Sequence, residues 1–249
     1  MLLITVYWLL VYAILKKMDD IAKYIDHANH SAKSTAEDIK VLCEEVKEYG
    51  FNAAFVNACW VKFAREIMGG EGKVGTVVSF PLGQDSTRDK VAAAVQAVED
   101  GADEVDVSAN VGWLKSGQTD KYLDEMRQVV EAVKLEKNLA VVKFIIEAVF
   151  LTEEEIAQAA RLVLESGADF IKTTSGFGPR DAKVEFVEII KEVVGDKIKV
   201  KAAGGIHSRE DFDRFIQAGA NRVGTSAGIA IITGQEPKDT SEWRKNGIF

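Results

Sequence analysis

Cysteine, proline and histidine are scarce in this chain of 249 residues, which has two cysteines, three prolines and three histidines. Cys43 and Cys59 have no metal-ligand spacing, and so few cysteines indicate a reducing compartment, which we expect to be the cytoplasm. His27, His30 and His207 form no HxxxH pair, the helical spacing found in many zinc sites. The sequence therefore argues against a catalytic metal.

Basic tracts are absent as well. The formal net charge is −8, and no cluster of lysine and arginine stands out from this acidic background. Both features argue against nucleic acid as a partner. The hydrophobic fraction of 47%, with twenty glycines and little proline, is typical of one large α/β domain. Single barrels of this length are common.

Long apolar runs are limited to the first 15 residues, MLLITVYWLLVYAIL, in which Thr5 is the only non-apolar side chain. The run is shorter than the roughly 20 residues that a bilayer span needs, and it lacks the basic start and the cleavage site of a signal peptide. A helix that is apolar all round must be buried. An interface helix in an oligomer, a membrane-associated anchor and an upstream extension are the alternatives, and we favour burial against protein over membrane contact. We divide the chain into this apolar N-terminal extension, residues 1–17, and a single domain, residues 18–249.

From Asp19 onward, short apolar segments alternate with helical patterns. A Gly-Ala-Asp or Gly-Ala-Asn motif ends a helix before a strand at Gly101, Gly167 and Gly219. Strands are predicted at Tyr24–Ala28, Asn52–Asn57, Lys73–Phe80, Glu104–Ala109, Ala140–Glu147, Phe170–Thr174, Lys199–Ala203 and Arg222–Ser226. Eight strands that alternate with helices indicate a (β/α)8 barrel, also called a TIM barrel. An open doubly wound sheet would carry a GxGxxG turn after its first strand, and this chain has none.

Two of the predicted strands carry a lysine just before a glycine-rich segment. Lys172 lies in Phe170–Thr174, and Lys201 lies in Lys199–Ala203. Neighbouring parallel strands would bring the two ammonium groups together, so that each disfavours the charged form of the other, and a neutral amine is a nucleophile. A purely structural ion pair is the alternative.

Strand alternation places Asp106 and Lys143 on the same inward face as these two lysines. Such a charged barrel interior must be mutually compensated or tuned for a reaction, and a buried ion network without chemistry is the alternative. Glycine-rich loops follow the last two strands, where barrels usually bind phosphate. Backbone N–H groups at Gly204 and Gly205 can approach an anion closely, and Ser226 can donate a hydroxyl.

Together these motifs resemble the deoxyribose-phosphate aldolase family, over nearly everything from Ile21 to Ile232. The segments that carry the resemblance are Ile25–His27, Gly50–Phe51, Phe80–Gly83, Gly101–Asp106, Asn110–Gly112, Leu114–Gly117, Asp169–Thr173, Gly176–Gly178, Val200–Ala202, Gly204–Ile206 and Gly224–Ser226. The resemblance implies a class I aldolase without metal or organic cofactor, acting on an aldehyde or sugar phosphate, and a homo-oligomer.

The resemblance also implies roles for single residues. Lys172 would form the Schiff base, Lys201 would lower the pKa of Lys172, and Asp106 would handle protons. Substrate and phosphate would be bound by Asp26, Gly176, Gly204, Gly205 and Ser226.

The chain departs from the family pattern around this centre. Where the family usually has a hydroxyl residue, this chain has Ala28, Ala148, Ala203 and Ala227, and His207 stands where arginine is common. We therefore expect an altered, more apolar substrate pocket. A catalytically weakened barrel, or a small-molecule binding protein, is the alternative from a different functional class.

Overall fold

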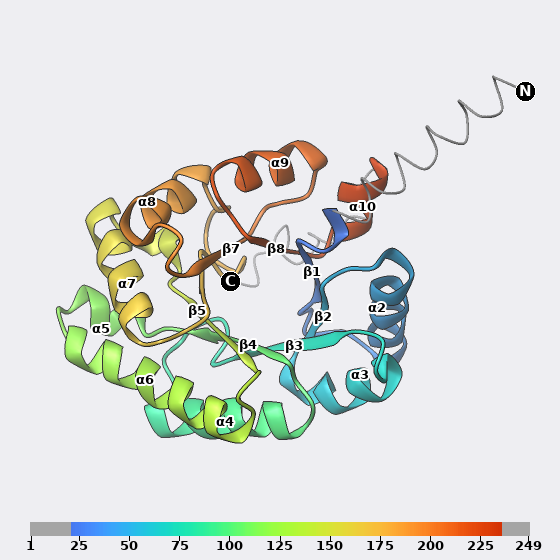
Figure 1. Ribbon diagram of the computed structural model, residues 1–249, viewed down its shortest axis with the longest axis horizontal. Helices are drawn as coiled ribbons and strands as arrows, with labels where there is room; N and C mark the ends of the chain where they lie inside the picture. Colours follow the sequence, from blue (N-terminus) through green and yellow to red (C-terminus); the bar gives the residue numbers. More distant parts are fainter. Residues whose placement is uncertain (1–20, 236–249) are drawn as a thin grey trace, which may run out of the picture.

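The computed structural model describes residues 21–235, which form a closed barrel of eight parallel strands (Figure 1). Neighbours in the barrel are neighbours in sequence, and β8 closes the barrel on β1. The strands are β1 Ile25–Asn29, β2 Ala53–Val56, β3 Lys73–Val78, β4 Glu104–Ser108, β5 Val141–Ile145, β6 Phe170–Lys172, β7 Lys199–Ala203 and β8 Arg222–Thr225. This confirms the predicted (β/α)8 barrel. The predicted apolar extension, residues 1–17, lies outside the described residues.

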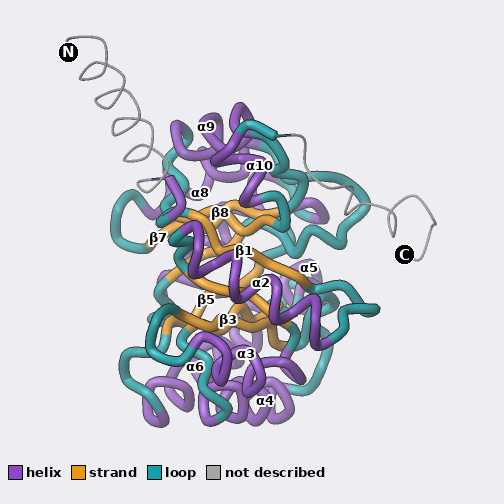
Figure 2. Tube along the Cα trace, turned by 90° about the vertical axis from the view of Figure 1, so that its right-hand side faces the viewer, coloured by secondary structure: helices purple, strands orange, loops and turns teal. Residues whose placement is uncertain are grey.

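Helices surround the barrel on its outer face (Figures 1 and 2). They are α2 Ala36–Tyr49, α3 Val61–Met68, α4 Thr87–Glu99, α5 Val111–Lys115, α6 Thr119–Glu136, α7 Glu153–Glu165, α8 Val184–Val194, α9 Arg209–Gln217 and α10 Gly228–Thr233, with short 3-10 turns η1 Ala58–Trp60 and η2 Ala148–Phe150. Helix α2 begins with a capping box between Thr35 and Asp38 and ends at Gly50, whose φ of 69° is left-handed. The sequence predicted both ends of this helix from the same residues.

The two faces of the barrel wall differ in chemistry. Val105 and Val107 of β4, like Ile171 of β6, are fully buried in the apolar layer between the barrel and its helices. The alternate positions point into the barrel and carry charge, among them Asp106 and Lys172. Because side chains alternate along a strand, the sequence pattern placed each of these residues on its correct face.

Strand β6 is shorter than the predicted Phe170–Thr174, since it ends at Lys172. The hydroxyl groups of Thr173 and Thr174 both donate to the carbonyl of Ala203, at 3.3 and 2.5 Å. These side-chain bonds tie the end of β6 to β7 and turn the chain out of the sheet.

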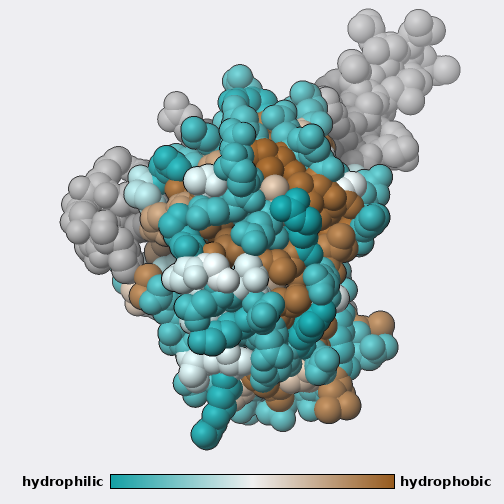
Figure 3. Space-filling model, turned by 90° about the vertical axis from the view of Figure 1, so that its left-hand side faces the viewer, coloured by the Kyte–Doolittle hydropathy of each residue, from teal (hydrophilic) through white to brown (hydrophobic). Residues whose placement is uncertain are grey.

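The surface of the described part is mixed. Figure 3 shows hydrophilic side chains over most of the face that lies on the left in Figure 1, with apolar side chains gathered in a band across it. None of the helices between residues 21 and 235 is long and apolar enough to cross a membrane.

Candidate active site

A single carboxylate, that of Asp106, accepts hydrogen bonds from three lysines inside the barrel. Its Oδ2 accepts hydrogen bonds from Nζ of Lys172 at 2.9 Å and from Nζ of Lys201 at 2.8 Å, while Oδ1 accepts from Nζ of Lys143 at 2.9 Å. The strand register produces this arrangement, because Lys172 pairs with Lys201 across β6 and β7 and Asp106 pairs with Lys143 across β4 and β5. The two lysine strands thus bring their amines together, as the sequence predicted.

A second tier of charges lies against the first. Asp26 on β1 accepts from Lys201 at 2.6 Å and from Arg222 at 2.8 Å. Glu104 on β4 lies 2.6 Å from Nζ of Lys143 and 3.6 Å from Nη1 of Arg222. Each cation except Lys172 therefore contacts two carboxylates, and Lys172 contacts one.

These charges balance only when one amine is neutral. The cationic members are Lys143, Lys172, Lys201 and Arg222, and the carboxylates are Asp26, Glu104 and Asp106. With every group ionised, the cluster carries one positive charge too many for a buried site. Lys172 has the fewest carboxylate partners, so loss of its proton neutralises the cluster at the smallest cost in free energy.

The pKa directions agree with this assignment. Burial is the largest cause that lowers the pKa of Lys172, to about 8, with Lys201 and Lys143 lowering it further and Asp106 opposing them. Burial also acts on Asp106, but the ammonium groups of Lys143, Lys172 and Lys201 hold its pKa well below the ordinary value. The pKa of Lys143 is raised, because its carboxylate neighbours outweigh burial. The sequence predicted the effect of Lys201, whereas the larger effect of burial on Lys172 needs the structure.

Aromatic rings fill the space beside the amines. The ring of Phe55 on β2 lies 3.6 Å from Nζ of Lys201 and 4.7 Å from that of Lys143. Room for this ring comes from Gly75 on β3, where a β-carbon would lie 2.3 Å from the tip of the ring. Phe80, just after β3, lies 5.6 Å from Nζ of Lys172. Apolar rings keep water from the amines, which strengthens every charge interaction among them.

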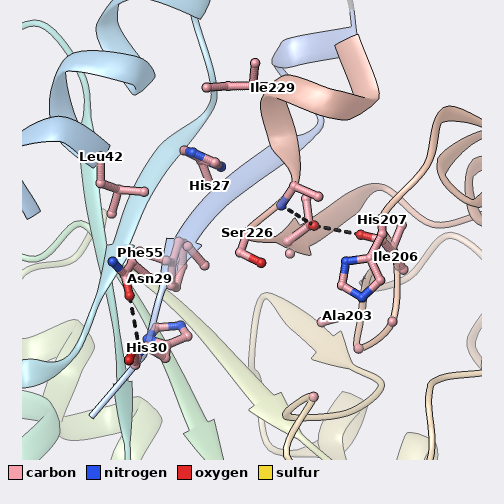
Figure 4. A pocket seen from close by; sticks show the side chains of 18 of the residues that line it. His27, Asn29, His30, Leu42, Phe55, Ala203, Ile206, His207, Ser226 and Ile229 are labelled. Carbon is pink, nitrogen blue, oxygen red and sulfur yellow. Dashed lines mark hydrogen bonds between the residues drawn. The ribbon is translucent and has the colours of Figure 1, made fainter. Parts of the chain in front are cut away.

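A cavity of about 550 Å³ opens over the carboxyl ends of β1, β6, β7 and β8, and both Lys172 and Lys201 line it. Figure 4 shows His27 and Leu42 on one side of this cavity and Ser226, Ile206 and His207 on the other. A deep site at this end of the strands is the usual place for a substrate in such barrels.

The predicted binding residues separate into two groups. Gly176, Gly204, Gly205 and Ser226 all line the cavity. Asp26, by contrast, is fully buried below it and contacts Lys201 and Arg222. Asp106 is also fully buried, but it reaches the cavity through the amine of Lys172.

The glycine loops are tightly packed at this end of the barrel. Gly204 has a φ of 98°, and a β-carbon there would lie 2.4 Å from the hydroxyl of Thr174. Gly176, with a φ of 84°, lies so close to Gly204 that an added β-carbon would be 3.5 Å from its Cα. Backbone groups rather than side chains thus form this wall, which suits an anion-binding loop.

Most of the departures from the family pattern lie around the same cavity. Ala28, Ala203, Ala227 and His207 line it, whereas Ala148 is fully buried at the start of η2. The missing hydroxyl groups therefore affect the cavity wall directly at three positions.

Two polar residues of the site were given no role by the sequence. His30 lines the cavity, and Glu147 accepts hydrogen bonds from the backbone N–H of Ser175 at 3.1 and 3.2 Å. Glu147 has a left-handed φ of 49°, and burial raises its pKa. A charged residue at the end of a barrel strand was the available signal for Glu147, while His30 lies in a loop whose course the sequence does not specify. Within residues 21–235, no group of three or more His, Cys, Asp or Glu side chains is arranged to hold a metal ion.

Comparison with known proteins agrees with this geometry. The model of the DeoC/LacD family aldolases matches residues 21–234. The deoxyribose-phosphate aldolase of Caldanaerobacter subterraneus subsp. tengcongensis is 45% identical over 230 residues, which cover 92% of this chain and 96% of that protein. The deoxyribose-phosphate aldolase of Thermococcus gammatolerans is 49% identical over 218 residues, covering 86% of this chain and 96% of that protein.

Solved structures show the same relationship. The aldolase QR15 has a TM-score of 0.81 at 40% identity, over 86% of this chain and 95% of that one. The deoxyribose phosphate aldolase of Aeropyrum pernix, described as a unique tetramer, has a TM-score of 0.79 at 28% identity, over 88% of this chain and 95% of that one. The chain therefore belongs to the DeoC/LacD family of aldolases, as the motifs around its two lysine strands predicted.

Proposed function

We propose that this class I aldolase cleaves 2-deoxy-D-ribose 5-phosphate into D-glyceraldehyde 3-phosphate and acetaldehyde, and joins the two aldehydes in the reverse direction, through a Schiff base on Lys172. One observation carries the proposal. Lys172 is a buried amine with a pKa of about 8, held on a carboxylate at the base of a cavity of about 550 Å³. The named substrate is that of the relatives, which are 45% and 49% identical.

Each step uses the amine as a nucleophile or an electron sink. The neutral Nζ of Lys172 adds to the aldehyde carbon, and the carbinolamine loses water to give an iminium. The iminium takes up the electron pair of the bond between the α- and β-carbons, while the hydroxyl on the departing β-carbon loses its proton and becomes a carbonyl. The enamine left on Lys172 gains a proton on carbon, and water then releases acetaldehyde.

The neighbouring charges have separate roles in this scheme. Asp106 touches Nζ of Lys172 at 2.9 Å and stays ionised, so it is placed to exchange protons with the amine and with the carbinolamine. The neighbouring amine of Lys201 lowers the pKa of Lys172. Asp26 is a positioning residue, because it binds Lys201 rather than the cavity.

The phosphate group would bind at the wall formed by Gly176, Gly204, Gly205 and Ser226. Ala28, Ala203 and Ala227 leave this cavity with fewer hydroxyl donors than the family pattern provides. We therefore expect weaker discrimination between phosphorylated and unphosphorylated substrates than the family pattern implies, because each missing hydroxyl removes a hydrogen bond.

Borohydride trapping tests the reaction directly. Incubation of the full-length chain with acetaldehyde and borohydride is expected to leave a reduced two-carbon adduct on Lys172, located by peptide mass spectrometry. An adduct on Lys143 or Lys201 instead would overturn the assignment, since both amines contact two carboxylates.

A binding protein on the same scaffold is the competing function, and the three alanines of the cavity wall favour it. The substitution Lys172→Met separates the two functions. An aldolase loses its turnover and its trapped adduct, whereas a binding protein keeps any residual turnover unchanged. The lowered pKa of Lys172 favours the enzyme, because ligand binding alone has no need of a neutral amine.

Assembly, location and domain division are further parts of the proposal. We propose a homo-oligomer, supported by the tetramer of the Aeropyrum pernix relative and by the apolar band in Figure 3.

A cytoplasmic location is supported by two free cysteines, Cys43 and Cys59. The match of the family model to residues 21–234 supports a catalytic domain in residues 18–249 and a separate extension in residues 1–17. Deletion of that extension should leave borohydride trapping intact.

A further inference from the structure

His30 borders the space into which a substrate on Lys172 would extend. The residue follows β1 and lines the cavity (Figure 4). Its ring packs against Phe80, with 5.3 Å between the ring centroids, and Nζ of Lys172 lies 5.6 Å from the centroid of the same Phe80 ring. A carbon chain bound to that amine therefore shares its surroundings with the imidazole.

The imidazole is a neutral hydrogen-bonding group. Burial, together with the charges of Lys172 and Lys201, lowers the pKa of His30 to about 3, against the opposing effects of Asp106 and of a hydrogen bond with Asn57. At neutral pH the ring therefore holds no extra proton and adds no further charge beside the two lysines. It cannot serve as the proton donor of the reaction, but it can bind a hydroxyl.

One nitrogen of this ring is left without a partner. Nδ1 is shielded from solvent and makes no hydrogen bond within residues 21–235. A neutral imidazole carries one ring proton, and in the tautomer with that proton on Nε2 the lone pair of Nδ1 can accept a hydrogen bond. Buried polar atoms are seldom left unpaired, and such an atom beside a cavity is stabilised by a ligand that pairs with it.

The partner of Nδ1 is restricted by the chemistry of the reaction. The two-carbon unit that acetaldehyde leaves on Lys172 carries no hydroxyl group. Once the carbinolamine has lost water, a reactant hydroxyl near His30 comes from the second aldehyde, the acceptor, which adds to that unit or leaves from it.

We propose, on the basis of the aldol reaction proposed above, that His30 is a specificity-determining residue whose neutral ring accepts a hydrogen bond from a hydroxyl of the acceptor aldehyde. The enzyme accordingly prefers hydroxylated acceptors to alkyl aldehydes of the same length. Ser34 lies in the same loop and donates its hydroxyl to Oδ1 of Asn29, the last residue of β1, at 2.7 Å, which fixes the approach of the loop to the cavity.

The test compares two unphosphorylated acceptors, D-glyceraldehyde and propanal, in addition of acetaldehyde by the full-length chain. The ratio of their kcat/KM values is expected to fall about tenfold in His30→Leu, the effect of one lost hydrogen bond between neutral groups. His30→Gln keeps an acceptor oxygen and should retain most of the ratio. His207→Leu makes the same chemical change elsewhere on the cavity wall and should leave the ratio unchanged.

Two results would overturn the proposal. An equal loss with both aldehydes in His30→Leu would assign the residue a packing role, and an unchanged ratio would remove it from acceptor recognition. Borohydride trapping of acetaldehyde is measured in parallel on every variant. Failure to trap any adduct in the unaltered chain would defeat the proposed reaction itself, whereas trapping with an unchanged ratio defeats only the role of His30.

Discussion

Burial at Lys172 converts an ordinary lysine into a usable nucleophile. With a pKa of about 8, about one amine in ten is neutral at pH 7. At the ordinary value of 10.5, only about one in 3,000 would be neutral. The neutral, reactive fraction of the amine is therefore about 300 times larger than in an ordinary lysine, before any contribution from substrate positioning. The surrounding charges compensate one another, which allows this amine to remain buried.

The substitution Lys201→Leu tests how much of this effect comes from the neighbouring charge. Lys201 lowers the pKa of Lys172, so its removal leaves the pull of Asp106 less opposed and raises that pKa. The pH at which imine formation is half-maximal should move upward by about one unit or more. A pH series of borohydride trapping measures it. An unchanged profile would show that the charge of Lys201 does not lower the pKa of Lys172.

At the scale of the strand, Gly224 on β8 has no side chain, and the side chain of Lys201 occupies the space beside it. A β-carbon at Gly224 would lie 2.8 Å from Cε of Lys201 and 3.5 Å from its Nζ. Gly224→Ala should push the amine off Asp106 and reduce kcat/KM about tenfold or more, because misplaced catalytic groups lose rate steeply. Gly70→Ala is the matched control, since nothing lies within 4 Å of its added β-carbon. Equal activity in the two variants would contradict the steric argument.

Between helices α4 and α6, a buried ion pair supports the loop after β3. Nζ of Lys90 lies 2.6 Å from Oε1 of Glu125 and also donates to the carbonyls of Gly83 and Ser108, at 2.8 and 3.0 Å. Lys90→Met leaves that carboxylate buried and unpaired, so the free energy of unfolding should fall by about 3–5 kcal/mol in urea titrations.

The exposed pair between Arg127 and Glu165 provides the control for this substitution. Both of its side chains are about half exposed, at 46% and 57%. Arg127→Met should change the free energy of unfolding by less than about 1 kcal/mol. A loss as small as this in Lys90→Met would mean that the buried pair has little net effect on stability.

For the whole molecule, the sequence predicted more of the barrel than of the cavity. Strand alternation assigns Asp106 and Lys172 to the interior without any knowledge of the fold, because the period of two is a local property. The wall of the cavity depends instead on loops, and His30 reaches it through a turn that no periodicity describes. For Asp26 the sequence predicted the strand but not the ion pair. Its partner, Lys201, is 175 positions away and lies across the closure of the barrel.

The interior charges should also make stability depend on pH in two windows. The pKa of His30 is lowered to about 3 from its ordinary 6.5, so the unfolded chain binds a proton that the folded chain refuses. The contribution of His30 to the free energy of unfolding is therefore full above pH 6.5 and is lost as the pH falls from 6.5 toward 3. Asp26, Glu104 and Asp106 also have lowered pKa values, so their contribution is lost below about pH 4, where unfolded carboxylates protonate.

Urea titrations between pH 3 and pH 8 can separate the two windows. The unaltered chain should lose stability gently from pH 6.5 downward and steeply below about pH 4. In His30→Gln the upper slope should flatten, because glutamine does not titrate, while the steep lower loss remains. Glu125 and Glu147 have raised pKa values and act in the opposite direction. They reduce the total change in the free energy of unfolding without moving either pH window. If His30→Gln keeps the full slope between pH 6.5 and pH 4, the imidazole is not held neutral by burial and by the charges of Lys172 and Lys201, and the loss must come from other groups.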